Sequence, residues 1–365
     1  MLHRRNMLKT AAAATLSVVI AGPVWAADGK VNVVATFSIL GDMVNRIGGD
    51  HVSVTTLVGP DGDAHVYQPV PADAAAVSKA DVLIVNGLAF EGWLDRLVDA
   101  SGFKGTRVVA TDGVEAISFE EEEHHDDEEH GEKHADHDDH AEHKHDDHDD
   151  RAEHKHDDHA DHKDDDHADH ADHKDDDHAG HDDHAGHDHG AFDPHAWQSA
   201  ANAVIYVDNI TSALSKADPA NAASYYENRA AYVAEIEAIE ATIKESVSAL
   251  PEDARTVVTP HDAFGYYAKA YGLTFLAPQG ISTEAEASAA DVATLIRQIR
   301  EQKIKAVFVE NIADTRLLQQ IANETGAAIG GSLFSDALSG PDGPAGTYLD
   351  MMRHNTATLV GALGS

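Results

Sequence analysis

Two stretches of this chain alternate short apolar runs with segments whose apolar residues recur at helical spacing. Short runs rich in Val and Ile are typical of strands buried in a sheet. The first stretch has predicted strands over 31–37, 52–58, 81–85 and 107–110, and predicted helices over 39–47, 73–79 and 90–100. The second has predicted strands over 256–258, 274–276, 306–309 and 327–329, and predicted helices over 263–271, 289–301, 315–324 and 348–363. Because strands alternate with helices, we predict two α/β lobes with parallel sheets covered on both faces.

Between these stretches, residues 218–250 carry the longest helical pattern of the chain. Asp218 is predicted to cap the helix with Pro219 at its first position, and Pro251 ends it. A helix of about 30 residues would span about 45 Å at 1.5 Å per residue, so it could connect both lobes as a stiff linker. Its apolar residues stand close to helical spacing, at Tyr225, Tyr232, Val233, Ile236, Ile239, Ile243 and Val247.

Residues 120–190 interrupt the pattern because they contain no Leu, Ile, Val, Met or aromatic residue. They hold 21 of the 27 histidines and 32 acidic against 6 basic residues, so their net charge is −26 of the chain's −39. A segment with nothing to bury cannot offset the entropy of ordering, and we predict a disordered insertion. Short blocks recur within it (141–148 at 152–159, and 160–168 at 171–179), which indicates that composition matters more than order.

The histidines of this insertion lie among carboxylates and form exchangeable nitrogen and oxygen sites, which are typical of divalent metal binding. The alternative is a solvated acidic spacer, which would explain the carboxylates and not the histidines. We predict auxiliary, low-affinity and weakly selective metal binding here, with these histidines singled out: His124, His125, His130, His134, His137, His181, His184, His187 and His189.

Residues 1–26 have the features of an export signal. The paired Arg4 and Arg5 precede an apolar run over 10–22, and Ala26 ends a predicted cleavage site. The arginine pair resembles a twin-arginine signal, with general secretion as the alternative. The apolar run is too short for a membrane anchor, and the chain has no Cys for lipid attachment. We therefore predict a periplasmic protein, cleaved near Ala26 and without a lipid anchor.

The predicted organisation is a signal peptide over 1–26, a first lobe over 27–217 that contains the insertion, a linker helix over 218–250 and a second lobe over 251–365. Outside the insertion the net charge is still −13, the remainder of −39. An acidic body attracts cations and disfavours nucleic acid as a partner. The absence of Cys excludes disulfides and thiolate ligands.

Ligands of open α/β sheets bind beyond the carboxyl ends of the strands. His65, His261 and Asp336 each follow a predicted strand, and His195 lies just after the insertion. Three imidazoles and one carboxylate would complete a tetrahedral zinc site. Taken singly, each histidine is more often an ordinary loop residue, and spacing along the chain does not establish that the four groups converge.

Other polar residues near these positions have different predicted roles. Asp193 and Asp262 flank two of the histidines and are predicted to support them rather than to bind metal. Glu310, at the end of a predicted strand, is not expected to bind metal. His51 and His354 are interpreted as ordinary turn and helix residues.

Two different functions are compatible with these residues. A periplasmic zinc hydrolase would use three histidines and leave the fourth position for water. The chain has no H-E-x-x-H motif, no Glu lies near the three histidines in the sequence, and Asp336 would close the site. The second alternative is a passive metal buffer in which the insertion is the functional part, so that its removal would abolish tight binding.

Five motifs stand in order along the chain: GPDGDAHVYQPVPAD, FDPHAW-x4-NA, DPANAASYYENRAAYV, TPHDAFGYYAKAYGL and SLFSDALS. Together they resemble the cluster A-I metal-binding proteins of ABC importers, within them the zinc-specific ZnuA-like and AztC-like branch. The resemblance covers nearly all of the chain after the signal. It implies paired Rossmann-like (β/α)4-type lobes joined by one long rigid helix, with metal held between the lobes.

The resemblance also implies a ligand set and a function. The ligands would be His65, His195, His261 and Asp336, and His261 stands where manganese-binding members carry a Glu, which favours zinc. The implied function is to capture Zn²⁺ as cargo and deliver it to an inner-membrane ABC permease and its ATPase, without enzymatic chemistry. The protein is expected to be a monomer, and a periplasmic zinc metallochaperone is a further candidate partner.

Overall fold

The computed structural model describes residues 29–118 and 192–364. The predicted signal peptide, the insertion over 120–190 and its auxiliary histidines lie outside them. None of the described helices combines the length and the apolar character needed to cross a membrane.

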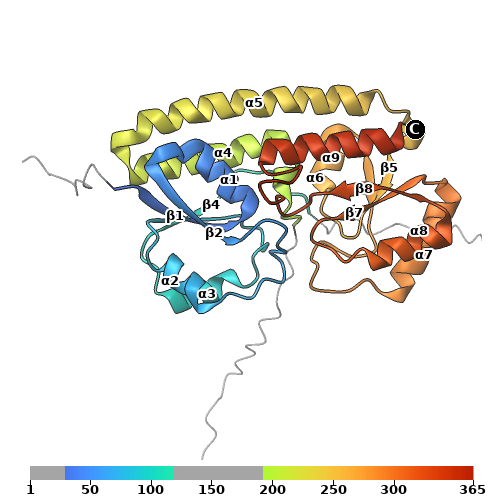
Figure 1. Ribbon diagram of the computed structural model, residues 1–365, viewed down its shortest axis with the longest axis horizontal. Coiled ribbons are helices and arrows are strands. Elements are labelled where there is room, and N and C mark those ends of the chain that lie inside the picture. The colour runs from blue at the N-terminus through green and yellow to red at the C-terminus, as the bar shows by residue number, and fades with distance from the viewer. Residues whose placement is uncertain (1–28, 119–191, 365) are drawn as a thin grey trace, which may run out of the picture. The chain divides into compact units, whose positions relative to one another are not determined.

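The first lobe is built on a parallel four-stranded sheet in the order β2-β1-β3-β4. In Figure 1, α1 and α4 cover one face of this sheet, and α2 and α3 lie on the other. Strand β3 is apolar at every position because both faces of the strand are covered. Its elements are β1 (Val31–Phe37), α1 (Ser38–Gly48), β2 (Val52–Val58), α2 (Pro71–Val77), β3 (Val82–Val85), α3 (Leu94–Ser101), β4 (Thr106–Val109) and α4 (Ala200–Ala217).

The second lobe repeats the plan, with a parallel sheet in the order β6-β5-β7-β8. A separate apolar cluster fills the space between this sheet and helices α7 and α8. The prediction of two α/β lobes with parallel sheets is confirmed. The elements are β5 (Thr256–Val258), α6 (Gly265–Tyr271), β6 (Thr274–Leu276), α7 (Ala289–Gln302), β7 (Ala306–Glu310), α8 (Arg316–Thr325), β8 (Ala328–Leu333) and α9 (Tyr348–Leu363).

Helix α5 (Ala222–Ser248) connects the lobes and packs against α1 and α4 of the first lobe and α6 and α9 of the second (Figure 1). Its 27 residues span about 40 Å. The buried face consists of residues three, four or seven apart, as one helical stripe requires: Tyr225, Tyr232, Ile236, Ile239, Ile243 and Val247. The long linker helix is therefore confirmed, and its stripe joins one apolar core that extends into both lobes.

Three details differ from the sequence prediction. Helix α5 begins at Ala222, and Asp218 does not cap it: the Asp218 carboxylate accepts hydrogen bonds from the Asn221 amide and the Tyr225 hydroxyl. Helix α3 begins at Leu94 rather than at residue 90, because residues 87–93 form a turn. Helix α4 was not predicted, since several of its buried positions are alanines, which weaken the apolar contrast of the pattern.

Candidate metal centre

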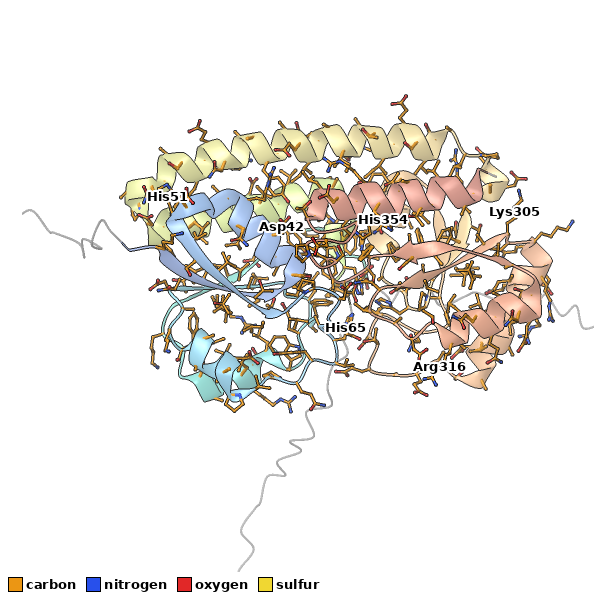
Figure 2. The ribbon with its side chains drawn as sticks, in the orientation of Figure 1. Asp42, His51, His65, Lys305, Arg316 and His354 are labelled. Atoms are coloured by element: carbon orange, nitrogen blue, oxygen red, sulfur yellow. The ribbon has the colours of Figure 1, made fainter. Side chains whose placement is uncertain are left out.

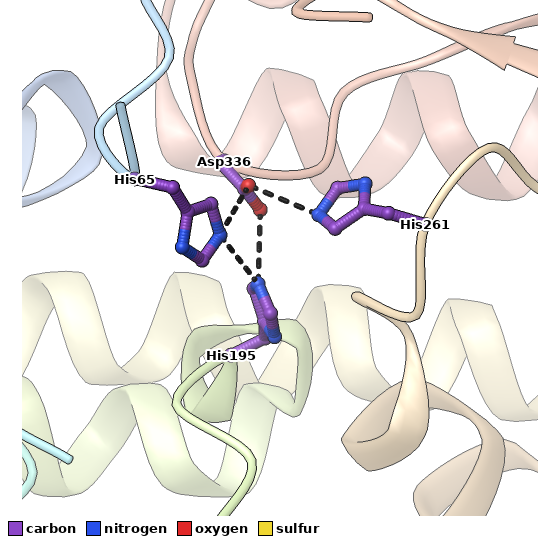
Figure 3. Close-up of side chains that lie close together, drawn as sticks. All are labelled: His65, His195, His261 and Asp336. Carbon is purple, nitrogen blue, oxygen red and sulfur yellow. Dashed lines mark hydrogen bonds and ion pairs between the residues drawn. The ribbon is translucent and has the colours of Figure 1, made fainter. Parts of the chain in front are cut away.

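Four polar side chains meet where the two lobes adjoin, beyond the carboxyl ends of the strands (Figure 3). His65 lies in the segment after β2, and His195 directly precedes the short 3-10 helix over 196–198. His261 follows β5, and Asp336 follows β8. One ligand atom from each residue lies within 4.8 Å of the others, so the fold brings together all four residues singled out from the sequence.

The distances within this group fit one small ion. His65 Nε2 lies 3.3 Å from His195 Nε2 and 3.2 Å from Asp336 Oδ2. His261 Nε2 is also 3.2 Å from Asp336 Oδ2, and His195 Nε2 is 3.5 Å from Asp336 Oδ1. Ligands placed 2.0–2.1 Å from a tetrahedral zinc ion are separated by about 3.3 Å. The four residues therefore form a divalent metal site with three imidazoles and one carboxylate.

Carboxylates behind two of the rings determine which nitrogen faces the centre. His195 Nδ1 lies 2.8 Å from Asp193 Oδ1, and His261 Nδ1 lies 2.5 Å from Glu310 Oε2. A ring that donates its Nδ1 proton to a carboxylate presents the Nε2 lone pair to the metal. In Figure 3 the Nε2 atoms of these two rings, like that of His65, face the Asp336 carboxylate.

The site is closed to solvent, which makes its charges interact strongly. His195, His261 and Asp336 have no exposed surface, and His65 is 5% exposed. Burial alone would favour the neutral His261 ring, but the carboxylates of Glu310 and Asp336 raise the pKa of His261 well above its usual range. Burial would raise the pKa of Asp336, yet His261 and His195 hold it well below its usual range. Both shifts favour pairing of a His261 imidazolium with the Glu310 and Asp336 carboxylates when no metal is bound.

Hydrogen bonds between the lobes hold the ligand loops together. The Trp197 indole donates to the Ser335 carbonyl at 2.9 Å, which joins the segment after His195 to the one that carries Asp336. The Thr283 hydroxyl donates to Asp63 Oδ2 at 2.7 Å, while Asp63 Oδ1 accepts from the backbone N–H of His65 at 2.9 Å. Both lobes are thus needed to keep the four ligand atoms within reach of one ion.

The structure adds a carboxylate that the sequence did not associate with the histidines. Glu310 is not among the four clustered ligand residues, but a Glu does lie beside a histidine in space, because β7 ends against the His261 loop. Glu310 is 49 residues from His261, so local spacing could not reveal the contact. Asp193 contacts His195 as predicted, and the backbone N–H of Asp262 donates to the Gly280 carbonyl.

The other predicted residues lie away from this centre. His51 packs edge-on against the Tyr225 ring, with centroids 5.9 Å apart. His354 Nε2 contacts the Ser332 carbonyl oxygen at 2.9 Å. Figure 2 shows both apart from His65.

Comparison with known proteins places this site in a family. Residues 33–362 match the family described as "Zinc-uptake complex component A periplasmic". The chain is 28% identical over 337 residues to a manganese-binding lipoprotein, MntA, of Halalkalibacterium halodurans, covering 92% of this chain and 90% of that protein. It is 29% identical over 335 residues to an iron-binding protein, YfeA, of Yersinia pestis, covering 92% and 87%.

A solved structure has the same fold. The periplasmic zinc-binding protein TroA of Treponema pallidum superposes with a TM-score of 0.71 at 25% identity, and the match covers 92% of this chain and 99% of that one. The names of these three proteins thus specify manganese, iron and zinc, respectively. The family match over nearly the whole described fold, together with the buried three-histidine, one-aspartate site, shows that this chain belongs to the ZnuA family of periplasmic or extracellular binding proteins and is the non-enzymatic, metal-binding component of an ABC importer.

Proposed function

We propose that the cargo is Zn²⁺, captured by His65, His195, His261 and Asp336 and delivered to the importer's permease and ATPase. The observation that carries this proposal is the spacing of 3.2–3.5 Å among three imidazole nitrogens and one carboxylate. Four such ligands suit tetrahedral zinc, whereas manganese is usually held by six mainly oxygen ligands. The protein supplies all four positions, so the ion is carried without a bound water and no bond chemistry is required.

The site also has features suited to transport rather than storage. Its ligands come from both lobes and are 0–5% exposed, so the ion cannot leave until a ligand segment moves. Docking of the loaded lobes on a permease is the event we propose to trigger that movement. In this scheme the protein is an exported monomer, and the histidines of the insertion over 120–190 gather zinc at low affinity and high local concentration near the specific site.

A chelator-competition titration of zinc tests where tight binding resides. The full chain and a variant without residues 120–190 are expected to share one tight site, because all four ligands lie outside the insertion. The deletion can be closed by a short turn, since Ser118 and Phe192 pair as an antiparallel bridge and Asp193 N–H donates to the Ile117 carbonyl. If tight binding disappeared with the insertion, the chain would instead be a histidine-rich metal buffer.

The same titration repeated with Mn²⁺ and Fe²⁺ under anaerobic conditions tests the choice of cargo. Zinc is expected to displace both ions from the deletion variant, since imidazole-rich sites favour zinc over manganese and iron. Retention of Mn²⁺ or Fe²⁺ against an equal concentration of zinc would overturn the zinc assignment and leave the importer assignment intact.

Zinc binding is expected to release a proton at pH values above the usual titration range of histidine. The raised pKa of His261 keeps this ring protonated above its usual range in the metal-free protein, and zinc must replace that proton. Because the proton competes with the metal, the apparent affinity falls about tenfold for each unit that the pH drops below the raised pKa. Calorimetry in two buffers of different ionisation enthalpy measures the released proton directly. A value near zero at pH 8 would mean that His261 titrates in its ordinary range.

A further inference from the structure

The three histidine rings are not oriented by the same means. Asp193 and Glu310 support the Nδ1 atoms of His195 and His261. Within the described part of the chain, Asp336 is the one carboxylate within ion-pairing distance of the His65 ring, and it lies on the metal side at Nε2. His65 therefore needs another restraint on its ring.

The backbone around His65 is held, so rotation of the side chain is the freedom that remains. The backbone N–H of His65 donates to Asp63 Oδ1 at 2.9 Å, and the Trp93 indole donates to the Ala64 carbonyl at 2.7 Å. Rotation about the side-chain torsions of His65 would move Nε2 away from the metal and leave this backbone in place.

Phe90 fills the space beside that ring. Its centroid lies 4.7 Å from that of His65 with the ring planes at 73°, and 5.9 Å from that of His195 at 78°. The ring centroids of Phe37 and Trp197 lie 5.0 and 4.9 Å from that of Phe90, so Phe90 belongs to a packed aromatic cluster. Edge-to-face contacts of this kind depend on orientation and would resist rotation of the His65 ring.

The turn that presents Phe90 has an unusual backbone. Gly87, Leu88 and Ala89 have φ values of 91°, 52° and 59°, a left-handed run in which two residues carry a Cβ. Such strain persists only where the surroundings determine the conformation, and it is common at functional sites. At Gly87 a Cβ would lie 2.5 Å from the Val109 side chain, so this position requires glycine.

Glu91 holds the turn closed. Its Oε1 accepts from the Asn86 backbone N–H at 2.7 Å and from the Thr36 hydroxyl at 2.6 Å, and its Oε2 accepts from the Gly87 N–H at 3.3 Å. Glu91 is buried, so these bonds are not exchanged with water. The carboxylate ties the start of the turn and strand β1 to the residue that follows Phe90.

We propose that Phe90, presented by this clamped turn, is a positioning residue for His65, and that its contact with the ring sets the rate at which the bound metal is released. The inference rests on the proposed carrier function and adds to it the ligand that leaves first. His65 is the ligand with exposed surface and with a packing contact in place of a carboxylate behind its ring. A movement of the turn over 86–91 would free this ligand while the other three stay in place.

The test compares Phe90→Leu with Phe37→Leu in the full chain loaded with one equivalent of Co²⁺. Phe37 belongs to the same aromatic cluster, and its ring contacts are with Phe90 and Trp197, so it controls for loosening of the core. Both variants are expected to lower the Tm. Phe90→Leu alone is expected to speed the loss of metal to excess chelator by about tenfold and to weaken the visible Co²⁺ absorption, as a water enters the tetrahedral site.

A double-mutant cycle completes the test. In a His65→Ala background, Phe90→Leu is expected to change the release rate no further, because the ring that it positions is gone. Unchanged release and absorption in Phe90→Leu, or an equal acceleration with and without His65, would overturn the inference. Since Co²⁺ reports on the site whichever ion is the natural cargo, these outcomes are distinct from a failure of the zinc assignment.

Discussion

Replacement of His261 by alanine is expected to weaken zinc binding at the tight site by at least about 100-fold. Zinc sites in proteins are stabilised by about 10–16 kcal/mol from four ligands, so one ligand corresponds to about 3 kcal/mol or more. His261 is fully buried and contacts Asp336, so its loss also leaves Glu310 without the imidazole beside it. The measurement is the zinc titration against a competing chelator, made on the variant without residues 120–190 so that weak sites do not interfere.

His51→Ala is the matched control, because this histidine packs on Tyr225 away from the metal centre. The control is expected to retain the affinity of the parent protein. If His261→Ala also retained it, the metal would be held elsewhere, and the site between the lobes would not be the transport site.

Replacement of Glu310 by glutamine is expected to lower zinc affinity by about 10- to 100-fold, although Glu310 is not a ligand. Its carboxylate lies 2.5 Å from His261 Nδ1, and it accepts a hydrogen bond from the Ser335 hydroxyl at 2.8 Å, next to Asp336. One buried charge thus holds both ligands that the second lobe provides. Glutamine keeps the shape but removes the charge that makes the His261 imidazole a stronger donor.

The effect of Glu310→Gln should appear in the proton release as well as in the affinity. Glu310 contributes to the raised pKa of His261, so fewer protons should be released at pH 8 in this variant. Asp314→Asn is a control, since Asp314 is a carboxylate that pairs with the exposed Arg316. A parental affinity in Glu310→Gln would show that the ring is oriented without this charge.

Much of the fold could be predicted because it is encoded locally. Runs such as Val82–Val85 are apolar throughout since both faces of a parallel strand are covered, and the stripe on α5 repeats at helical spacing because one face is buried. Local patterns fail where a turn resembles a helix. The apolar Phe90 and Trp93 suggested a helix from residue 90. The Glu91 carboxylate instead accepts hydrogen bonds from the backbone N–H groups of Asn86 and Gly87 and so stabilises a turn.

The sequence by itself determined the types of donor and their placement after strands: His65, His261 and Asp336 follow β2, β5 and β8. Asp193 could also be found, because it lies two residues from His195. That these groups converge within 4.8 Å was decided only by the tertiary structure, as were the contacts of Glu310 with His261 and of Phe90 with His65. Residues that are distant in the chain meet only when parallel strands align their carboxyl ends and two lobes pack together, and no periodicity along the chain records which loops will then face each other.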